Sequence, residues 1–216
     1  MNNKTFYLTF LFLIIISCAP SPSKLAEINP NALINNADSL IAQRPDDIEL
    51  RNAIVEAHLN LAKLESDFNV EIITQNVDDL HERAGSTKVT HLHGELLKAR
   101  STGDEKDILE WKKNLVLGNL CKKNYQLRPH IVWFGEMVPL LEKAIKITKT
   151  ADILVIIGTS MQVYPAASLV NYVKPNTPIY FIDPKPNVSI NDYNNITIIK
   201  DFASNGTNTL SMYLKT

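Results

Sequence analysis

The sequence predicts an α/β fold built on a mainly parallel sheet, preceded by a helical segment and an export signal. From Asn69 onward, short apolar runs alternate with amphipathic stretches, which is typical of parallel strands covered by helices on both faces. The 216 residues are 45% hydrophobic and 21% charged, enough for one packed domain with a short appendage. The formal net charge of -1 gives no reason to expect a nucleic-acid partner.

Residues 1–18 predict the export signal. Lys4 precedes a largely apolar run from Phe6 to Ile16, and Cys18 follows it. The run is shorter than the roughly 20 residues that span a bilayer, and the stretch ending at Cys18 resembles a bacterial lipobox. Cys18 is then expected to carry a lipid anchor after cleavage. The alternative is that the same run forms a buried strand or an uncleaved anchor.

Residues 19–31 predict a linker, and residues 32–66 predict two helices. Apolar residues recur at three- and four-residue spacing from Leu33 to Ile41 and again from Leu50 to Leu64, with a turn at Pro45 between them. The pair resembles one unit of a tetratricopeptide repeat, which needs stacked neighbours. An ordinary helix pair packed on the α/β domain is an equal alternative.

Residues 67–216 predict the α/β domain itself. Strands are expected at Val70–Thr74, Ile153–Ile157, Ile179–Ile182 and Ile196–Ile199, and helices at Leu140–Thr148 and Ala166–Tyr172. Polar residues or a glycine turn follow the first three of these strands. Because ligands bind beyond the carboxyl ends of strands in open α/β sheets, the pattern predicts a nucleotide site there.

Four motifs, in this order, resemble the sirtuin family of NAD-dependent protein-lysine deacylases. They are Gln75-Asn76-Val77-Asp78, His91-Leu92-His93-Gly94-Glu95, Phe134-Gly135-Glu136 and Gly158-Thr159-Ser160. With Arg128–Trp133 before the third motif, the chain is similar to the bacterial class that includes acetyl- and succinyl-lysine deacylases. The resemblance implies a Rossmann-like sheet, NAD as cofactor, an acylated lysine of a protein or peptide as partner, and a cytoplasmic location. The lipobox predicts a membrane-anchored lipoprotein instead.

The resemblance also implies roles for single residues. His93 would be the general base that activates a ribose hydroxyl, which suits an ordinary histidine pKa of about 6.5. Gln75 would orient the ribose, Asn76 would position the nicotinamide ribose or a water, Asp78 would accept from the carboxamide, and Gly94 would leave room for the ribose. Further NAD contacts are expected from Gly158, Thr159, Ser160, Asp183 and Ala203, and peptide contacts from Phe134, Gly135, Glu136, Val163 and Tyr164.

Each motif alone has a simpler structural interpretation. His91 and His93 could be half of a metal site, although no further ligands stand nearby at a recognisable spacing. Asp78 could cap a helix, Gly158 could belong to a routine turn, and Phe134 could be a core contact. Their occurrence together and in order favours the family resemblance.

The largest departure from the family lies upstream of Gln75. No glycine precedes Gly85, so the glycine-rich phosphate loop of a dinucleotide site is absent. The first βα unit, which normally supplies the central strand, is therefore predicted to be missing. The incomplete sheet would leave backbone groups unpaired, so that either the domain is unstable alone or an unknown partner covers the gap.

The second departure is in residues 98–127, where family members commonly carry two cysteine pairs. Cys121 is the one cysteine there, so no zinc is expected. Apolar packing without metal is expected instead, from Ile108, Leu109, Trp111, Leu115, Val116, Leu117 and Leu120.

Two functions follow from these features. The first is an NAD-dependent protein-lysine deacylase impaired by loss of the phosphate loop. The alternative is an inactive lipoprotein, or a gene-fusion remnant, that acts as a binding module.

Overall fold

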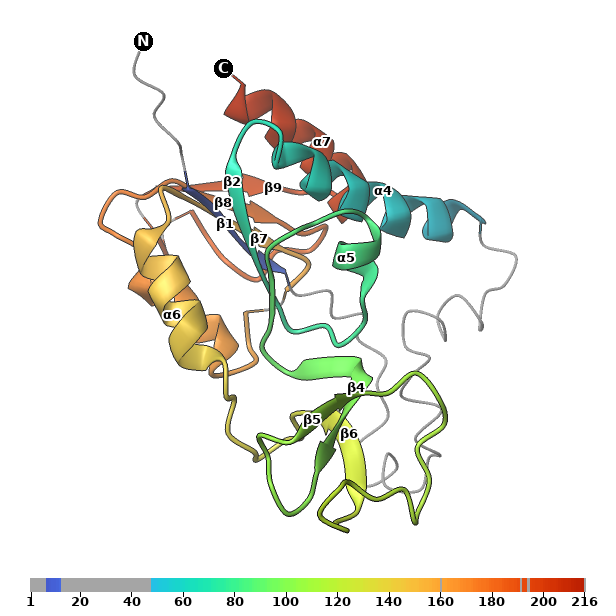
Figure 1. Ribbon diagram of the computed structural model, residues 1–216. Helices are drawn as coiled ribbons and strands as arrows, with labels where there is room; N and C mark the ends of the chain where they lie inside the picture. Colours follow the sequence, from blue (N-terminus) through green and yellow to red (C-terminus); the bar gives the residue numbers. More distant parts are fainter. Residues whose placement is uncertain (1–6, 13–47, 160, 191, 194, 216) are drawn as a thin grey trace.

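A six-stranded sheet, parallel at every pairing, forms the centre of the domain in a computed structural model (Figure 1). The structure describes residues 7–12, 48–159, 161–190, 192–193 and 195–215. The strand order is β3-β2-β1-β7-β8-β9. The strands are β1 (Tyr7–Phe12), β2 (Asn69–Thr74), β3 (Val89–His91), β7 (Ile153–Ile157), β8 (Ile179–Ile182) and β9 (Ile196–Ile199). The four strands predicted from apolar runs are thus confirmed as β2, β7, β8 and β9.

The prediction that the central strand is missing is wrong, because β1 occupies that place. Tyr7–Phe12 pairs in parallel with β2 along its whole length and with β7 on its other side. A strand buried on both faces of a parallel sheet needs a continuous apolar run, which is also what an export signal needs. The strand alternative therefore holds for Tyr7–Phe12, and no partner is required to fill the gap between β2 and β7. Cys18 and the linker of residues 19–31 lie outside the described residues.

One face of the sheet is covered by α4 (Ile48–Leu64) and α7 (Ala203–Leu214), which lie side by side (Figure 1). Leu61 and Leu64 of α4 and Leu210 of α7 are buried against Val155 of β7. Asn60 links the helices by donating to Thr207 Oγ1 at 3.1 Å. The second predicted helix is confirmed as α4, packed as an ordinary helix of the domain, and the first lies outside the described residues.

The opposite face is covered by α6 (Leu141–Thr150) and by η1 (Ala166–Tyr172), which is a 3-10 helix. Ala144 of α6 and Leu169 of η1 are buried with Leu154 of β7 and Phe181 of β8. Both helices were predicted, and the two apolar layers fix the sheet between them. Of the described helices, none is long and apolar enough to cross a membrane.

A separate three-stranded sheet forms the small module, with the antiparallel order β5-β4-β6. Its strands are β4 (Gly94–Ser101), β5 (Ile108–Glu110) and β6 (Leu127–Ile131), which lie beyond the end of the main sheet (Figure 1). Its core consists of Ala99, Cys121 and Leu127, with Leu109, Trp111 and Leu115 packed against it. Within the described part of the chain, no group of three or more His, Cys, Asp and Glu side chains could hold a metal ion.

The expected packing of the small module was only partly right. Leu109, Trp111 and Leu115 do pack, but Ile108, Val116, Leu117 and Leu120 are exposed. Val116 to Asn119 forms a turn, closed by a 3.1 Å bond from Asn119 N to Val116 O. Val116 and Leu117 lie in this turn and are exposed. The module is too thin to bury every apolar residue of its sequence.

Candidate functional site

The candidate site lies beyond the carboxyl ends of the parallel strands. From β1 the chain proceeds outward to β2 and β3 and later returns to β7, β8 and β9 on the other side of β1. The order therefore reverses between β1 and β7, and such switch points are where open α/β sheets bind ligands. Gln75 follows β2, Gly158 follows β7 and Asp183 follows β8. Those predicted residues thus share one edge of the sheet.

His93 lies between β3 and β4 and is half-buried at that edge. Burial lowers its pKa below the ordinary value, while a hydrogen bond to the Gln75 backbone carbonyl partly opposes that shift. The backbone of His93 is fixed as well, because its carbonyl accepts from Val132 N at 2.8 Å. The lowered pKa favours a neutral ring at neutral pH, and a neutral ring that donates to the Gln75 carbonyl keeps its other nitrogen as a proton acceptor.

The backbone at Gly94 requires glycine, whatever contact the residue makes with a ribose. Its φ is +87°, and a Cβ built there would lie 2.0 Å from the carbonyl oxygen of His130 on β6. Glycine is required here because the backbone of β6 in the small module passes close to the chain directly after His93. Gly94 thus fixes where the catalytic-base candidate meets the module.

The segment after β2 is held by hydrogen bonds at successive residues. Asn76 N donates to Thr74 Oγ1 at 3.0 Å, and Asn76 O accepts from His91 Nδ1 at 2.9 Å. Asp78 Oδ1 accepts from Leu80 N at 3.1 Å, which ties the start of α5 (Leu80–Arg83) to the same segment. Burial raises the pKa of Asp78. Asp78 stands one residue before Asp79, the N-cap of α5, whose side chain makes no capping bond.

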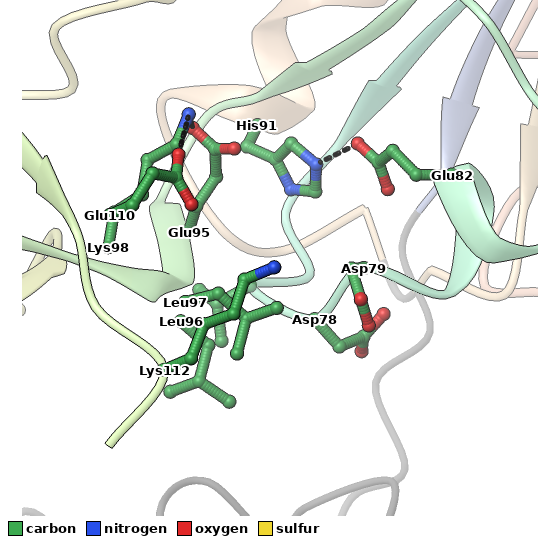
Figure 2. A pocket seen from close by; sticks show the side chains of 11 residues that line it. Asp78, Asp79, Glu82, His91, Glu95, Leu96, Leu97, Lys98, Glu110 and Lys112 are labelled. Atoms are coloured by element: carbon green, nitrogen blue, oxygen red, sulfur yellow. Dashed lines mark hydrogen bonds and ion pairs between the residues drawn. The ribbon is translucent and has the colours of Figure 1, made fainter. Parts of the chain in front are cut away.

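A cavity of about 190 Å³ opens beside this segment, toward the small module (Figure 2). Its charged lining consists of Asp78, Asp79, Glu82, Glu95 and Glu110, with Lys98 and Lys112. His91 also lines it and lies 2.8 Å from Glu82, while Lys98 lies 2.8 Å from Glu95 (Figure 2). Asp78 belongs to this cavity, whereas His93 is not among its lining residues. The predicted residues are thus divided between the strand edge and this acidic hollow.

On the other side of β1, the turn after β7 is tightly built. Gly158 has a φ of +60°, and its N donates to Ile182 O at 2.9 Å. Thr159 is only 3% exposed and accepts from Met161 N at 3.0 Å. The hydroxyl oxygen of Thr159 is therefore engaged within the turn. Ser160 lies outside the described residues.

Asp183 and Ala203 complete this side. Asp183 Oδ1 accepts from Lys185 N at 2.7 Å, directly after β8. Ala203 is the first residue of α7, and Gly206, one turn further on, packs against Ile182 at the end of β8. The start of α7 is therefore fixed against the strand that carries Asp183.

Comparison with known proteins identifies this arrangement. The Sir2 family model matches residues 26–165, well over half of the chain. The chain belongs to the Sir2 family. A Helicobacter pylori protein named NAD-dependent protein deacylase is 59% identical over 130 residues, which is 60% of this chain and 57% of that protein. A Bacteroides thetaiotaomicron deacylase is 47% identical over 163 residues, 73% of this chain and 69% of its own.

Solved Sir2 structures cover nearly the whole chain. A Sir2 homolog in complex with NAD superposes with a TM-score of 0.70 and 30% identity, over 98% of this chain and 90% of that one. By sequence, however, the chain spans little more than half the length of the Helicobacter pylori relative, at 57%. The structural superposition, rather than the sequence match, shows the Sir2 fold across the domain.

In this Sir2 chain two large side chains that were predicted to contact a peptide are exposed. Phe134 lies in the segment after β6, and Tyr164 lies in the segment after β7. Phe134 is 87% exposed, so the core-contact alternative is wrong for it, and Tyr164 is 73% exposed. Glu136 does not stand free beside them, because it pairs with Arg128 and Arg100 and accepts from Trp133 N at 3.1 Å. Gly135 has a φ of +89°, which its turn requires. Val163 accepts from Ala167 N and thereby starts η1.

Three residues of the Sir2 site were not predicted from the sequence. Buried His91 pairs with the partly exposed Glu82 beside Asn76, and Arg100 of β4 pairs with Glu136, which follows β6. Arg100 is 5% exposed and His91 is 6% exposed. Buried arginines need a partner, but the partner of Arg100 lies 36 positions away in the sequence, so no local pattern indicated it.

Proposed function

We propose that this chain is an NAD-dependent protein-lysine deacylase that transfers an acyl group from lysine to ADP-ribose. The observation that supports it best is His93, half-buried at the switch-point edge with a lowered pKa and an N–H donated to Gln75. When bound, NAD supplies the ribose that receives the acyl group, with release of nicotinamide. The names of the deacylase relatives and of the NAD-bound Sir2 homolog support the same reaction.

His93 is proposed as the general base. Because its donating nitrogen is committed to the Gln75 carbonyl, its other nitrogen is the acceptor for a proton from a ribose hydroxyl. The sign of the pKa change favours this role, since a lowered pKa leaves the ring neutral at pH 7. The same nitrogen can return the proton later in the reaction.

The strand-edge residues fit a dinucleotide. Gln75 is proposed to orient the ribose and Asn76 to position the nicotinamide ribose or a water. Asp78, whose pKa burial raises, would accept from the carboxamide. On the other side of β1, the turn at Gly158 and Thr159, with Ser160 after it in the sequence, would contact the adenosine half. Asp183 after β8 and Ala203 at the start of α7 would contact the same half.

Binding of the pyrophosphate is proposed to be weak. No glycine precedes Gly85, so the usual close approach of a glycine-rich backbone to the phosphates is absent upstream of Gln75. We infer that turnover is impaired mainly through a high KM for NAD rather than through loss of the base. No zinc is proposed to take part.

An extended acyl-lysine peptide is proposed as the substrate, lying between the segments that expose Phe134 and Tyr164. These side chains are 87% and 73% exposed, as peptide-contacting aromatic groups would be before binding. Gly135 and Val163 would offer backbone groups in the manner of an added strand. Glu136 would support that surface from behind through its pair with Arg128.

The cytoplasm is the proposed location. Cleavage before Cys18 would remove Tyr7–Phe12, the strand that pairs with both β2 and β7. A lipoprotein processed in that way would have to fold without its central strand. The competing hypothesis, an inactive lipoprotein acting as a binding module, has no specific contact of the described residues in its favour.

The test is calorimetric titration of the full chain with NAD, together with turnover of an acetyl-lysine peptide. We expect weak NAD binding and slow turnover that His93→Ala abolishes without changing the melting temperature. His130→Gln is the matched control, because it removes an imidazole of β6 outside the proposed machinery. A folded protein that neither binds NAD nor turns over the peptide would overturn the proposal in favour of a binding module.

A further inference from the structure

His91 occupies an unusual place two residues before the proposed base. It is the last residue of β3 and is 6% exposed. Its Nδ1 lies 2.9 Å from the Asn76 carbonyl oxygen, and its Nε2 lies 2.8 Å from Glu82 Oε1. Both partners can only accept when Glu82 is ionised, so both ring nitrogens must donate for both bonds to form. The geometry therefore requires a doubly protonated imidazolium.

The groups around His91 favour that charge. Burial opposes it, but the bonds to Glu82 and to the Asn76 carbonyl, together with the charges of Glu82 and Glu95, raise the pKa of His91 overall. His81 of α5 and Asp78 of the β2 segment also face it, and their charges act in opposite senses. Figure 2 shows the His91 ring pointing at Glu82 along the wall of the acidic cavity.

The imidazolium ties together the pieces that carry the proposed NAD contacts. Through Asn76 it holds the segment after β2, and through Glu82 it holds α5. The neighbouring Gln75 carbonyl receives the N–H of His93. A shift of the Asn76 peptide would therefore move the acceptor that sets the tautomer of His93.

We propose that His91 is a positioning residue for the deacylase reaction: as an imidazolium clamped between Asn76 and Glu82, it fixes the Gln75 carbonyl that orients His93. It touches neither substrate nor the reacting atoms in this role. The inference rests on the proposed function, because orientation of His93 matters only if His93 is the base. The protein would then need one histidine charged and a second, two residues away, neutral.

This requirement predicts a two-sided pH profile. Protonation of His93 removes activity on the acid side, below the ordinary pKa of about 6.5, because burial lowers its pKa. Deprotonation of His91 removes activity on the alkaline side, because its pKa is raised and its second donor is lost there. Glu82→Gln keeps an acceptor oxygen but removes the charge, so it should shift the alkaline limb to lower pH and leave the acid limb in place.

The experiment combines NMR of the histidine rings with steady-state kinetics on the full chain. In the wild type at pH 7, we expect both nitrogens of His91 to be protonated and His93 to be a single neutral tautomer. In His91→Gln, the His93 tautomer should become mixed, and kcat should fall about tenfold to a hundredfold, with KM for NAD changing less than threefold. His130→Gln should change neither readout.

The outcomes separate the two proposals. A His91 ring with one protonated nitrogen at pH 7, or an unchanged His93 tautomer in His91→Gln, overturns the positioning role even if the protein is an active deacylase. An alkaline limb that Glu82→Gln leaves unmoved also overturns it. Absence of turnover in the wild type, with NAD bound or not, counts against the proposed function alone, because the ring NMR is read without catalysis.

Discussion

The Arg128 guanidinium holds the Glu136 carboxylate through two hydrogen bonds, of 2.6 Å and 3.1 Å. Arg100, which stands opposite Arg128 on the neighbouring strand β4, reaches the same carboxylate at 2.9 Å. Glu136 in turn accepts from Trp133 N. One carboxylate thus fixes the exposed segment around Phe134 to β4 and β6, which makes it a support for the proposed peptide surface rather than a part of it.

Replacing Glu136 with Gln should loosen that segment. The variant leaves Arg100, which is 5% exposed, without its charge partner, and we expect a loss of about 1–3 kcal/mol in the free energy of unfolding. KM for the acyl peptide should rise more than KM for NAD. Urea denaturation and peptide kinetics would measure these effects. Glu110→Gln is the control, because Glu110 is 70% exposed and its ion pair with Lys98 is long, at 4.0 Å. Equal effects of the two variants would contradict the support role.

The same cluster predicts a pH dependence of stability. The hydrogen bond from Arg128 holds the pKa of Glu136 at about 2, below its ordinary 4.5. A lowered carboxyl pKa stabilises the fold at pH values above 4.5, and that stabilisation is lost as the pH falls toward 2. Glu136→Gln should therefore reduce the loss of stability between those pH values.

The parallel strands could be predicted largely because their apolar runs are continuous. β2, β7, β8 and β9 lie where such runs stand in the sequence. The same signal failed at β1, since a central parallel strand and an export signal both need an uninterrupted apolar run. β4 and β6 were not predicted because Lys98, Arg100 and Arg128 interrupt their alternation, and these charges are explained only by pairing across the module.

The site was predictable to a similar extent. The motifs placed Gln75, His93 and Gly158 near strand ends, which a parallel sheet necessarily brings to one edge. The support behind them was not predictable, because the bond between His91 and Glu82 depends on how α5 docks. The contact between Arg100 and Glu136 joins residues 36 positions apart. Local sequence carries no signal for such pairings.

A proline in β1 should decide whether Tyr7–Phe12 is a structural strand. Thr9 pairs with Glu71 on one side and with Leu154 on the other, so each backbone N–H of this segment faces a neighbouring strand. Thr9→Pro removes one donor and introduces a steric clash, and we expect a loss of about 3 kcal/mol or more in unfolding free energy. Thr9→Ala, which keeps the N–H, is the matched control. If the proline variant melts with the control, the segment does not hold the sheet together.

Acid should destabilise the contact between α4 and α5. Burial, followed by the charge of His58, lowers the pKa of His81 to about 3, and the two rings lie 4.6 Å apart. The unfolded chain binds a proton near the ordinary 6.5 while the folded chain does not, so stability falls as the pH drops below 6.5. Between pH 6.5 and pH 5 this histidine accounts for about 2 kcal/mol. His81→Phe should remove that part of the fall, as measured by urea midpoints at both pH values; equal slopes in the two proteins would show that another group is responsible.

Gly94→Ala should displace the site from the small module without removing a polar side chain. The added Cβ would meet the His130 carbonyl at 2.0 Å, and the positive φ of +87° adds strain of its own. We expect a loss of about 1–3 kcal/mol in stability together with a larger loss of kcat, because the clash displaces the chain directly after His93. Gly118→Ala is the control, since its φ is +93° but no atom lies within 4 Å of the new Cβ. The strain from a positive φ is common to both variants, so only the close approach to β6 distinguishes them. If Gly118→Ala lowers kcat as much as Gly94→Ala, the close approach of Gly94 to β6 does not set the position of His93.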